Sequence, residues 1–287
     1  MPSQLIQWFP GHMAKTKRLI RESLSSVDLI IEVLDARVPL SSANPELMRL
    51  ISGKPLLKLF SKTGLADPDK TAAWKRFYAE KGIECVFIDT ISGSGYNEIM
   101  PAVRRLLAEK IERNEKKGMS GKALRAMVVG IPNSGKSSLI NKLAGAKKAR
   151  VEDRPGVTVS KQWVSTSIGL ELLDMPGVLW PKFEDQTVGL RLAFTGAVKD
   201  DVLDLLDVAS RLCGTLRETY PRCLCERYKL SEEELYADEL SYDLLLRIGK
   251  KRGFLLSGGV VDDDRTARIL LDEFRGGKIG RITLEKP

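Results

Sequence analysis

The chain has 287 residues, of which 43% are apolar and 29% are charged, and its formal net charge is +8. This composition is typical of globular proteins and excludes bulk disorder. No uncharged apolar run approaches the length of a membrane-spanning helix, and the first residues lack the apolar region of a secretory signal. The four cysteines are too few to indicate a disulfide framework. We therefore expect a cytoplasmic protein with no membrane partner.

The positive charge is unevenly distributed along the chain. Residues 1–182 carry 29 Lys and Arg against 18 Asp and Glu, whereas residues 183–287 carry 17 against 20. The surplus is concentrated in residues 1–21, which hold no acidic side chain, and in residues 104–125. This pattern favours a polyanionic partner that one region of the protein contacts, although a solvated basic surface would have the same composition.

The predicted elements change character along the chain. Apolar, β-branched runs predict strands at residues 29–34, 55–60, 85–88, 126–129, 164–168 and 170–173, and helical spacing occurs at 71–81 and 97–117. Strands that alternate with helices are typical of a mostly parallel sheet covered on both faces. Beyond residue 181 helical periodicity dominates, at residues 202–220, 242–250 and 263–274. We predict an N-terminal segment (1–16), an α/β domain (17–181) and a small helical domain (182–287).

A phosphate-binding loop is predicted at Gly130–Ser137, which fits the pattern G-x-x-x-x-G-K-[ST]. A strand precedes this segment and a helical segment follows it, which is the context that the motif requires. Its glycines allow backbone N–H groups to surround phosphate oxygens. Lys136 would neutralise the β- and γ-phosphates, and the Ser137 hydroxyl would bind Mg²⁺.

Two downstream segments complete the expected phosphate site. Asp174 ends a strand and begins the sequence D-x-P-G, so its carboxylate can reach the metal through water and the Gly177 N–H can meet a γ-phosphate. Taken alone, D-x-P-G would be a plain turn. Thr158 lies in an intervening loop and could close over Mg²⁺ only when a γ-phosphate is present.

The expected base-binding segments precede the phosphate loop instead of following it. Residues 59–67 follow the second predicted strand and are related to N-K-x-D, and residues 88–95 are similar to the loop whose backbone N–H reads the guanine carbonyl. This order indicates a circular permutation of a GTPase. The residues that we expect to contact the nucleotide are Ser61, Lys62, Thr63, Gly64, Thr90, Ile91, Gly130, Asn133, Ser134, Gly135, Lys136, Ser137, Ser138 and Gly177.

Over essentially its whole length the chain resembles the circularly permuted GTPases and, within them, the ribosome biogenesis GTPase A family. The segments that carry the resemblance are Gln7–Ala14, Asp35–Pro39, Gly130–Ser137, Asp153–Thr158, Gly177–Asp185 and Ser257–Gly259. The resemblance implies a Rossmann-like P-loop GTPase domain with a mostly parallel sheet and a C-terminal helical RNA-binding domain. It also implies GTP, GDP and the precursor of the large ribosomal subunit, with its rRNA, as partners in late subunit assembly.

The base-binding segment departs from the family pattern Asn-Lys-x-Asp. Ser61 replaces the Asn and Gly64 replaces the Asp, which would accept two hydrogen bonds from guanine. Bonds to a charged partner contribute roughly 1.5–3 kcal/mol each, so losing both predicts a weakened guanine preference. Asp67 lies about one turn later and is the nearest substitute that the segment offers. The alternative function is therefore an RNA- or ribosome-binding assembly factor with degenerate or relaxed nucleotide specificity; an ATPase or small-molecule kinase is a third.

The hydrolytic groups are also inferred from the resemblance. Val178 stands where many small GTPases have a water-orienting Gln. The family instead suggests His12, the single histidine of the chain, although a capping or surface role would also explain it. Asn133 resembles the potassium ligand of cation-activated GTPases, so we expect K⁺ beside Mg²⁺ as a cofactor.

In the helical domain, Cys213, Cys223 and Cys225 show no recognisable zinc spacing, and we interpret them as plain thiols. Basic residues at 247–252 and along 265–281 could meet RNA phosphates or form a solvated helix face. We expect a monomer.

Overall fold

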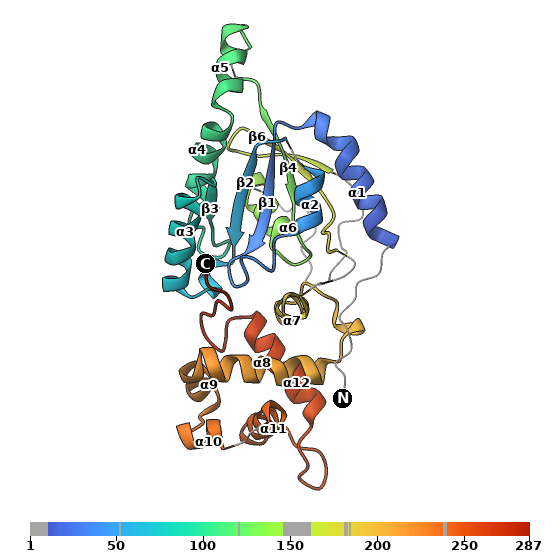
Figure 1. Ribbon diagram of the computed structural model, residues 1–287, viewed down its shortest axis with the longest axis vertical. Coiled ribbons are helices and arrows are strands. Elements are labelled where there is room, and N and C mark those ends of the chain that lie inside the picture. Colours follow the sequence, from blue (N-terminus) through green and yellow to red (C-terminus); the bar gives the residue numbers. More distant parts are fainter. Residues whose placement is uncertain are drawn as a thin grey trace. The chain divides into compact units, whose positions relative to one another are not determined.

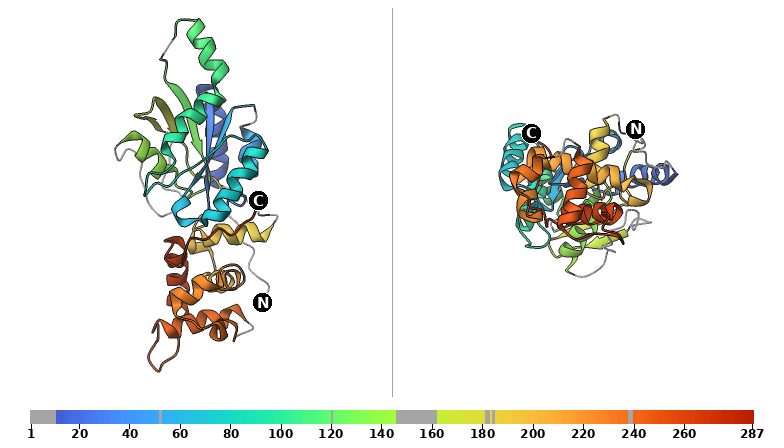
Figure 2. Two further views of the ribbon diagram at one scale, coloured as in Figure 1. Left: turned by 90° about the vertical axis from the view of Figure 1, so that its left-hand side faces the viewer. Right: turned by 90° about the horizontal axis from the view of Figure 1, so that it is seen from below.

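The computed structural model describes residues 11–51, 53–119, 121–145, 162–180, 183, 185–237 and 240–287, with side chains from residue 14 onward. The described residues divide into two compact units. One comprises residues 11–180 together with Glu285–Pro287, and the other comprises Phe183–Leu284 (Figures 1 and 2). Within the described residues, no helix has the length and apolar character needed to cross a membrane.

The first unit is built on one six-stranded sheet with the order β3-β2-β1-β4-β6-β5. Its strands are β1 (Leu29–Asp35), β2 (Leu56–Ser61), β3 (Cys85–Phe87), β4 (Leu124–Val129), β5 (Gln162–Ser165) and β6 (Leu170–Asp174). All neighbours pair in parallel except β5, which is antiparallel to β6. The register places Asp35 opposite Ser61, at the carboxyl ends of two central strands. The mostly parallel sheet predicted from the sequence is confirmed.

Helices cover both faces of this sheet, as Figure 1 shows. The apolar residues of β1 alternate between two cores because successive side chains of a strand point to opposite faces. Ile31 and Val33 pack in a core with residues of α4 (Tyr96–Leu106) and α6 (Lys136–Ala144). On the other face, Ile30 packs with residues of α1 (Gly11–Ser23) and α2 (Pro45–Leu50), and Leu34 packs with Trp74 of α3 (Pro68–Glu80).

Several boundaries differ from the sequence predictions. The segment 97–117 forms two helices, α4 and α5 (Ala108–Lys116), because Leu107 leaves helical geometry while its side chain remains buried. The run 164–168 stops pairing at Ser165, where a turn through Gly169 leads into β6. Helix α1 spans residues 16 and 17, where the sequence placed a domain boundary, and both Thr16 and Ile20 are buried.

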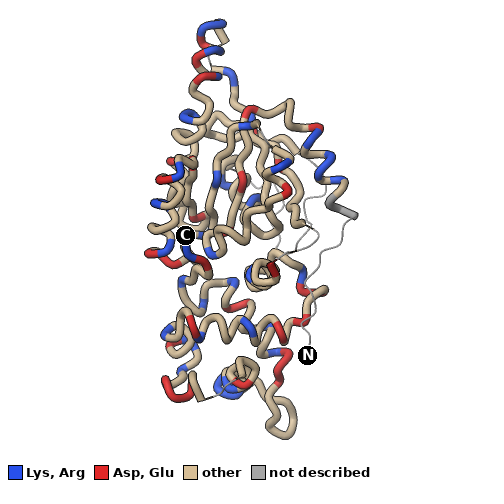
Figure 3. The backbone as a smooth tube through the Cα atoms, in the orientation of Figure 1, with Lys and Arg blue, Asp and Glu red and all other residues tan. Residues whose placement is uncertain are grey.

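Helix α5 matches the solvated helix that its charge pattern predicts. None of its side chains is buried, and Lys116 bonds Glu112 one turn earlier. Figure 3 shows basic and acidic residues along this helix.

The second unit is helical. Its elements are α7 (Gln186–Phe194), η3 (Asp200–Val202), α8 (Leu205–Thr219), α9 (Pro221–Tyr228), α10 (Glu232–Tyr236), α11 (Ser241–Lys251) and α12 (Asp263–Arg275). Buried Glu273 of α12 bonds Arg227 and Tyr228 of α9. Burial would raise the pKa of Glu273, but these donors lower it, so the carboxylate stays charged and joins the two helices.

Candidate nucleotide site

The loop between β4 and α6 requires glycine at the two glycine positions of the motif. Gly130 has a φ of 149°, and a Cβ there would lie 2.4 Å from the Val33 carbonyl oxygen. Gly135 has a φ of 94° and would bring a Cβ within 3.1 Å of the Ser61 hydroxyl. The loop therefore fits against the ends of β1 and β2 only without side chains at these positions.

Lys136, the first residue of α6, is turned into this loop. Its ammonium group donates to the carbonyl oxygens of Gly130 (3.2 Å) and Ile131 (2.7 Å). Burial lowers the Lys136 pKa to about 8, with Lys62 adding to the shift and Asp174 opposing it. Among the described residues, this ammonium donates only to backbone carbonyls and Asp174 lies nearby without a hydrogen bond to it, so a phosphate would supply the anion that binds it directly.

Asp174 ends β6 beside this ammonium. Burial raises the Asp174 pKa to about 6, although the charge of Lys136 lowers it. Its buried Oδ1 accepts no hydrogen bond from any residue that the structure describes. Gly177 follows closely, and a Cβ there would lie 2.9 Å from the Pro132 nitrogen and 3.1 Å from the Lys136 ammonium. The Val178 N–H donates to the Gly130 carbonyl, which joins the D-x-P-G segment to the phosphate loop.

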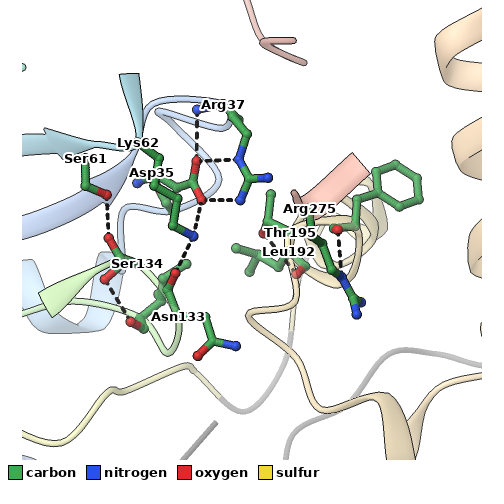
Figure 4. A network of polar contacts seen from close by, with 12 residues as sticks. Asp35, Arg37, Ser61, Lys62, Asn133, Ser134, Leu192, Thr195 and Arg275 are labelled. Atoms are coloured by element: carbon green, nitrogen blue, oxygen red, sulfur yellow. Dashed lines mark hydrogen bonds and ion pairs between the residues drawn. The ribbon is translucent and has the colours of Figure 1, made fainter. Parts of the chain in front are cut away.

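Ser61 and Lys62 bind the phosphate loop from the end of β2. The Ser61 hydroxyl lies within hydrogen-bond distance of the carbonyl oxygens of Leu34 and Ser134. The Lys62 ammonium donates to the Asn133 carbonyl and to Asp35 Oδ2. Figure 4 shows these contacts converging between the ends of β1 and β2 and the phosphate loop. Ser61 and Lys62, which the sequence placed at the base site, therefore also fix the position of the phosphate loop.

Asp35 is the carboxylate at the centre of this network. Its two oxygens accept from Arg37 Nε (3.0 Å), from Arg37 Nη2 (2.8 Å) and from Lys62. Both Asp35 and Arg37 are almost fully buried. Burial alone would raise the Asp35 pKa, but the two cations lower it well below its usual range. The group is therefore a permanent anion inside the protein.

The two predicted base loops lie side by side beyond β2 and β3. Ile88 N–H donates to the Phe60 carbonyl, and Thr63 N–H donates to the Ile88 carbonyl. Gly64 is exposed, whereas the Ile91 N–H donates to Asp89 Oδ1 at 3.1 Å. The Ile91 side chain is 87% exposed. Thr90 accepts a hydrogen bond from the Tyr96 hydroxyl.

Asp67, the substitute considered for the missing base-binding carboxylate, has a local role. Its Oδ1 accepts from the N–H groups of Asp69 and Lys70 and so caps the start of α3. Two further predicted site residues cannot be placed, because Thr158 and the side chain of His12 lie outside the described residues.

The central anion was not identified from the sequence, although the segment Asp35–Pro39 was part of the resemblance. An acidic residue at the carboxyl end of a central parallel strand is a usable signal, because ligands bind at that edge of a sheet. A second unforeseen contact joins the chain terminus to the same region. Glu285 accepts from the N–H groups of Leu40 and Ser41, just after β1.

Two cysteines of the helical unit, Cys213 and Cys225, have thiols whose pKa is raised. Cys213 is fully buried in α8, and burial raises its pKa. Burial also raises the pKa of Cys225. A thiol that stays protonated is a poor nucleophile and a poor metal ligand, so the raised pKa is consistent with the prediction of plain thiols at these two positions.

The arrangement defines a class of protein. A phosphate loop follows β4, an Asp ends the neighbouring β6, and the two predicted base loops follow β2 and β3, which come earlier in the chain. A mostly parallel sheet with these loops at the carboxyl ends of its strands defines a P-loop GTPase. The order of the loops along the chain makes it a circularly permuted one.

Comparisons with known proteins specify the class further. Residues 125–231 match the family model described as a 50S ribosome-binding GTPase. The chain is 47% identical to ribosome biogenesis GTPase A of Bacillus licheniformis over 99% of both chains. It is 48% identical to the protein of the same name from Bacillus cereus, over 99% of this chain and 94% of that protein. The chain belongs to the ribosome biogenesis GTPase A family and is a GTP hydrolase.

A solved structure shares the fold. The crystal structure of GNP-bound YlqF from T. maritima aligns with a TM-score of 0.63, covering 95% of this chain and 98% of that one. The two sequences are 24% identical, so this similarity concerns the fold.

Replacing Asp35 by Asn should destabilise the first unit by about 3 kcal/mol, because Arg37 and Lys62 would be left without their buried counter-charge. The lowered pKa means that Asp35 contributes its full stabilisation above pH about 4 and loses it as the pH falls further. The variant should therefore lack part of the acid sensitivity of the wild type. Urea unfolding between pH 3 and 7 measures both effects.

The exposed Asp69→Asn variant is the matched control and should unfold like the wild type. Equal stability of the Asp35→Asn variant and the wild type at pH 7 would show that the buried anion is dispensable.

Proposed function

We propose that this protein hydrolyses GTP while docked on the precursor of the bacterial large ribosomal subunit, late in its assembly. Full-length similarity to proteins named ribosome biogenesis GTPase A supports the process. The observation that carries the chemistry is the buried Lys136 ammonium, which lies next to Asp174 and is bonded only to phosphate-loop carbonyls among the contacts described. The alternative, an assembly factor with degenerate nucleotide binding, is not favoured by this similarity.

The phosphate loop would hold the triphosphate. Lys136 would leave its carbonyl partners for the β- and γ-phosphates, and the N–H groups at the start of α6 would add the partial positive charge of a helix N-terminus. Gly177 lies close enough to Lys136 for its N–H to meet the γ-phosphate. The remaining loop contacts would come from Gly130, Asn133, Ser134, Gly135, Ser137 and Ser138.

The residues present fit a magnesium ion. The buried Oδ1 of Asp174 accepts no hydrogen bond from the part of the chain that the structure describes, and a cation would satisfy it. Ser137 and Thr158 would supply hydroxyl oxygens, as Mg²⁺ prefers. When bound, the ion would neutralise charge on the phosphates. The protein's own part is to keep the carboxylate buried and in place.

Hydrolysis should depend on the ribosomal precursor. Single-turnover rates with GTP, measured with and without purified large subunits, should be higher with them. The Lys136→Ala variant should lower the stimulated rate by roughly 100-fold or more, because it removes a charge aimed at the transferred phosphoryl group.

Large subunits that leave the GTP rate unchanged would contradict the proposed coupling to the ribosome. Unimpaired hydrolysis by Lys136→Ala would contradict the phosphate site. The Lys142→Ala variant is the matched control for loss of a lysine, because Lys142 is exposed and lies in the last turn of α6.

Ribosomal RNA would be met by the basic N-terminal residues, by the 104–125 segment and by basic residues of the helical unit. Helix α5 has five exposed charged side chains, Glu109, Glu112, Arg113, Glu115 and Lys116. Such phosphate contacts weaken as salt rises because counterions are released on binding. We propose a cytoplasmic monomer for this role.

We propose His12 as the group that handles the proton of the attacking water, because histidine is the side chain best suited to gain and lose a proton near neutral pH. The His12→Ala variant should lower kcat by roughly 100-fold or more and leave the Kd for GTP unchanged. Stopped-flow binding and single-turnover hydrolysis separate the two quantities. An unchanged rate would remove His12 from the mechanism.

We further propose that the Asn133 amide oxygen binds an activating K⁺. Hydrolysis should then be faster in K⁺ than in Na⁺ at equal ionic strength, and the Asn133→Ala variant should lose the difference. Equal rates of the wild type in the two salts would contradict this assignment. Choline chloride serves as the control for ionic strength.

A further inference from the structure

The Gly64 position is filled from the neighbouring loop. An ideal Cβ built on Gly64 would lie 2.6 Å from Asp89 Oδ2 and 3.1 Å from Asp89 Cγ. Gly64 does not have a positive φ, so its backbone would accept a side chain. The obstacle is the Asp89 carboxylate, which lies too close to the Cβ that any other residue at position 64 would carry.

Backbone hydrogen bonds fix this juxtaposition. The bonds between Thr63 and Ile88 and between Ile88 and Phe60 extend the pairing of β2 with β3 into the two loops. The loop after Asp89 closes on itself, because Asp89 N–H donates to the Ser94 carbonyl and Gly93 N–H donates to the Asp89 carbonyl. Asp89 therefore starts a tight turn directly beside Gly64.

Gly95 ends this turn and holds it against β3. A Cβ at Gly95 would lie 2.1 Å from the Phe87 carbonyl oxygen, and its φ of 79° also favours glycine. The turn is therefore packed directly against the backbone of β3 at Phe87. The backbone thus fixes the position of residue 89, and the Ile91 N–H and the Ser92 hydroxyl hold its carboxylate by donating to Oδ1 and Oδ2.

The polar groups at this point match the edge of guanine. The edge presents a carbonyl acceptor, then the N1–H donor, then the 2-amino donor. Asp89 Oδ1 accepts from the Ile91 N–H at 3.1 Å, so a backbone donor and two carboxylate oxygens already lie side by side. Adenine has a donor and an acceptor in the reversed order at the same edge, and would face Ile91 and Asp89 with mismatched groups.

We propose that Asp89 reads the guanine base of GTP in place of the carboxylate missing at position 64. This inference rests on the proposed function and names the specificity-determining residue of that same site. Ile91 N–H would turn to the base carbonyl, while the Asp89 oxygens would accept from N1–H and the amino group. Guanine preference is then retained. The weakened preference predicted from the sequence assumed that no other carboxylate lies at the base site.

The Asp89→Asn variant tests the proposal, because the amide keeps one oxygen to accept from N1–H but replaces the acceptor that would face the 2-amino group by a donor. Xanthine carries a second carbonyl where guanine carries the amino group. The variant should bind GTP roughly 100-fold or more weakly and bind XTP more tightly than the wild type does. Equilibrium titration with GTP, XTP and ATP measures these affinities.

A purely structural role of Asp89 gives a different result. If the side chain only orders its own turn, Asp89→Asn should bind GTP like the wild type and gain no affinity for XTP. That result would overturn the proposal. The Asp67→Asn variant is the matched control, since Asn caps a helix as well as Asp does, and its nucleotide preference should be that of the wild type.

Returning the carboxylate to position 64 provides a second test. The Asp89→Ala variant should lose GTP affinity, and adding Gly64→Asp should recover it, because the alanine makes room for the new side chain. Gly64→Asp alone should weaken GTP binding, since it places two carboxylates in one space. A double variant that binds GTP no more tightly than Asp89→Ala does would contradict the proposal that a carboxylate at position 64 can replace that of Asp89.

The two hypotheses can fail separately. Wild-type protein that binds neither GTP nor GDP would contradict the proposed function. Wild-type protein that binds GTP, together with an Asp89→Asn variant that binds it equally well, would contradict only the role of Asp89. Thermal unfolding of each variant shows whether it is folded, and a folded variant that binds GDP poorly and XDP well supports the assignment independently of hydrolysis.

Discussion

The buried anion of Asp35 is the interaction on which the arrangement of the nucleotide site depends. It lies at the carboxyl end of β1, between β2, which leads to the first predicted base loop, and β4, which leads to the phosphate loop. Lys62 bonds it and also bonds the Asn133 carbonyl, so one cation joins three separate segments (Figure 4). A buried charge persists only with close counter-charges, and this requirement fixes the geometry around it.

Local patterns accounted for much of this structure. The phosphate loop was predictable because its glycines, Lys136 and the flanking strand and helix all lie within a short stretch of sequence. The sheet was predictable because its central strands are buried on both faces and read as continuous apolar runs. Helices α1 and α2 were not predicted. Their apolar residues, such as Ile20 and Leu47, are too few to stand out, although Asn44 followed by Pro45 is a usable start signal for α2.

Contacts between distant segments could not be predicted in this way. Nothing near Gly64 in the sequence shows that Asp89 fills its place, since the proximity results from the pairing of β2 with β3. The Glu285 carboxylate likewise meets Leu40 and Ser41 from the opposite end of the chain. The sequence can still point to such a contact through an acidic residue that has no role in a nearby helix cap or ion pair.

The strand order has a consequence for how the protein is divided. The first three strands form one side of the sheet and the last three form the other. The chain connects them between α5 and β4, where residues 117–119 and 121–123 are exposed. Only the pairing of β1 with β4 joins the two sides within the sheet. A cut in that stretch would yield two fragments, one with the base loops and one with the phosphate loop. Each would lack a complete core, so the nucleotide would be a ligand shared by both and would favour their reassembly.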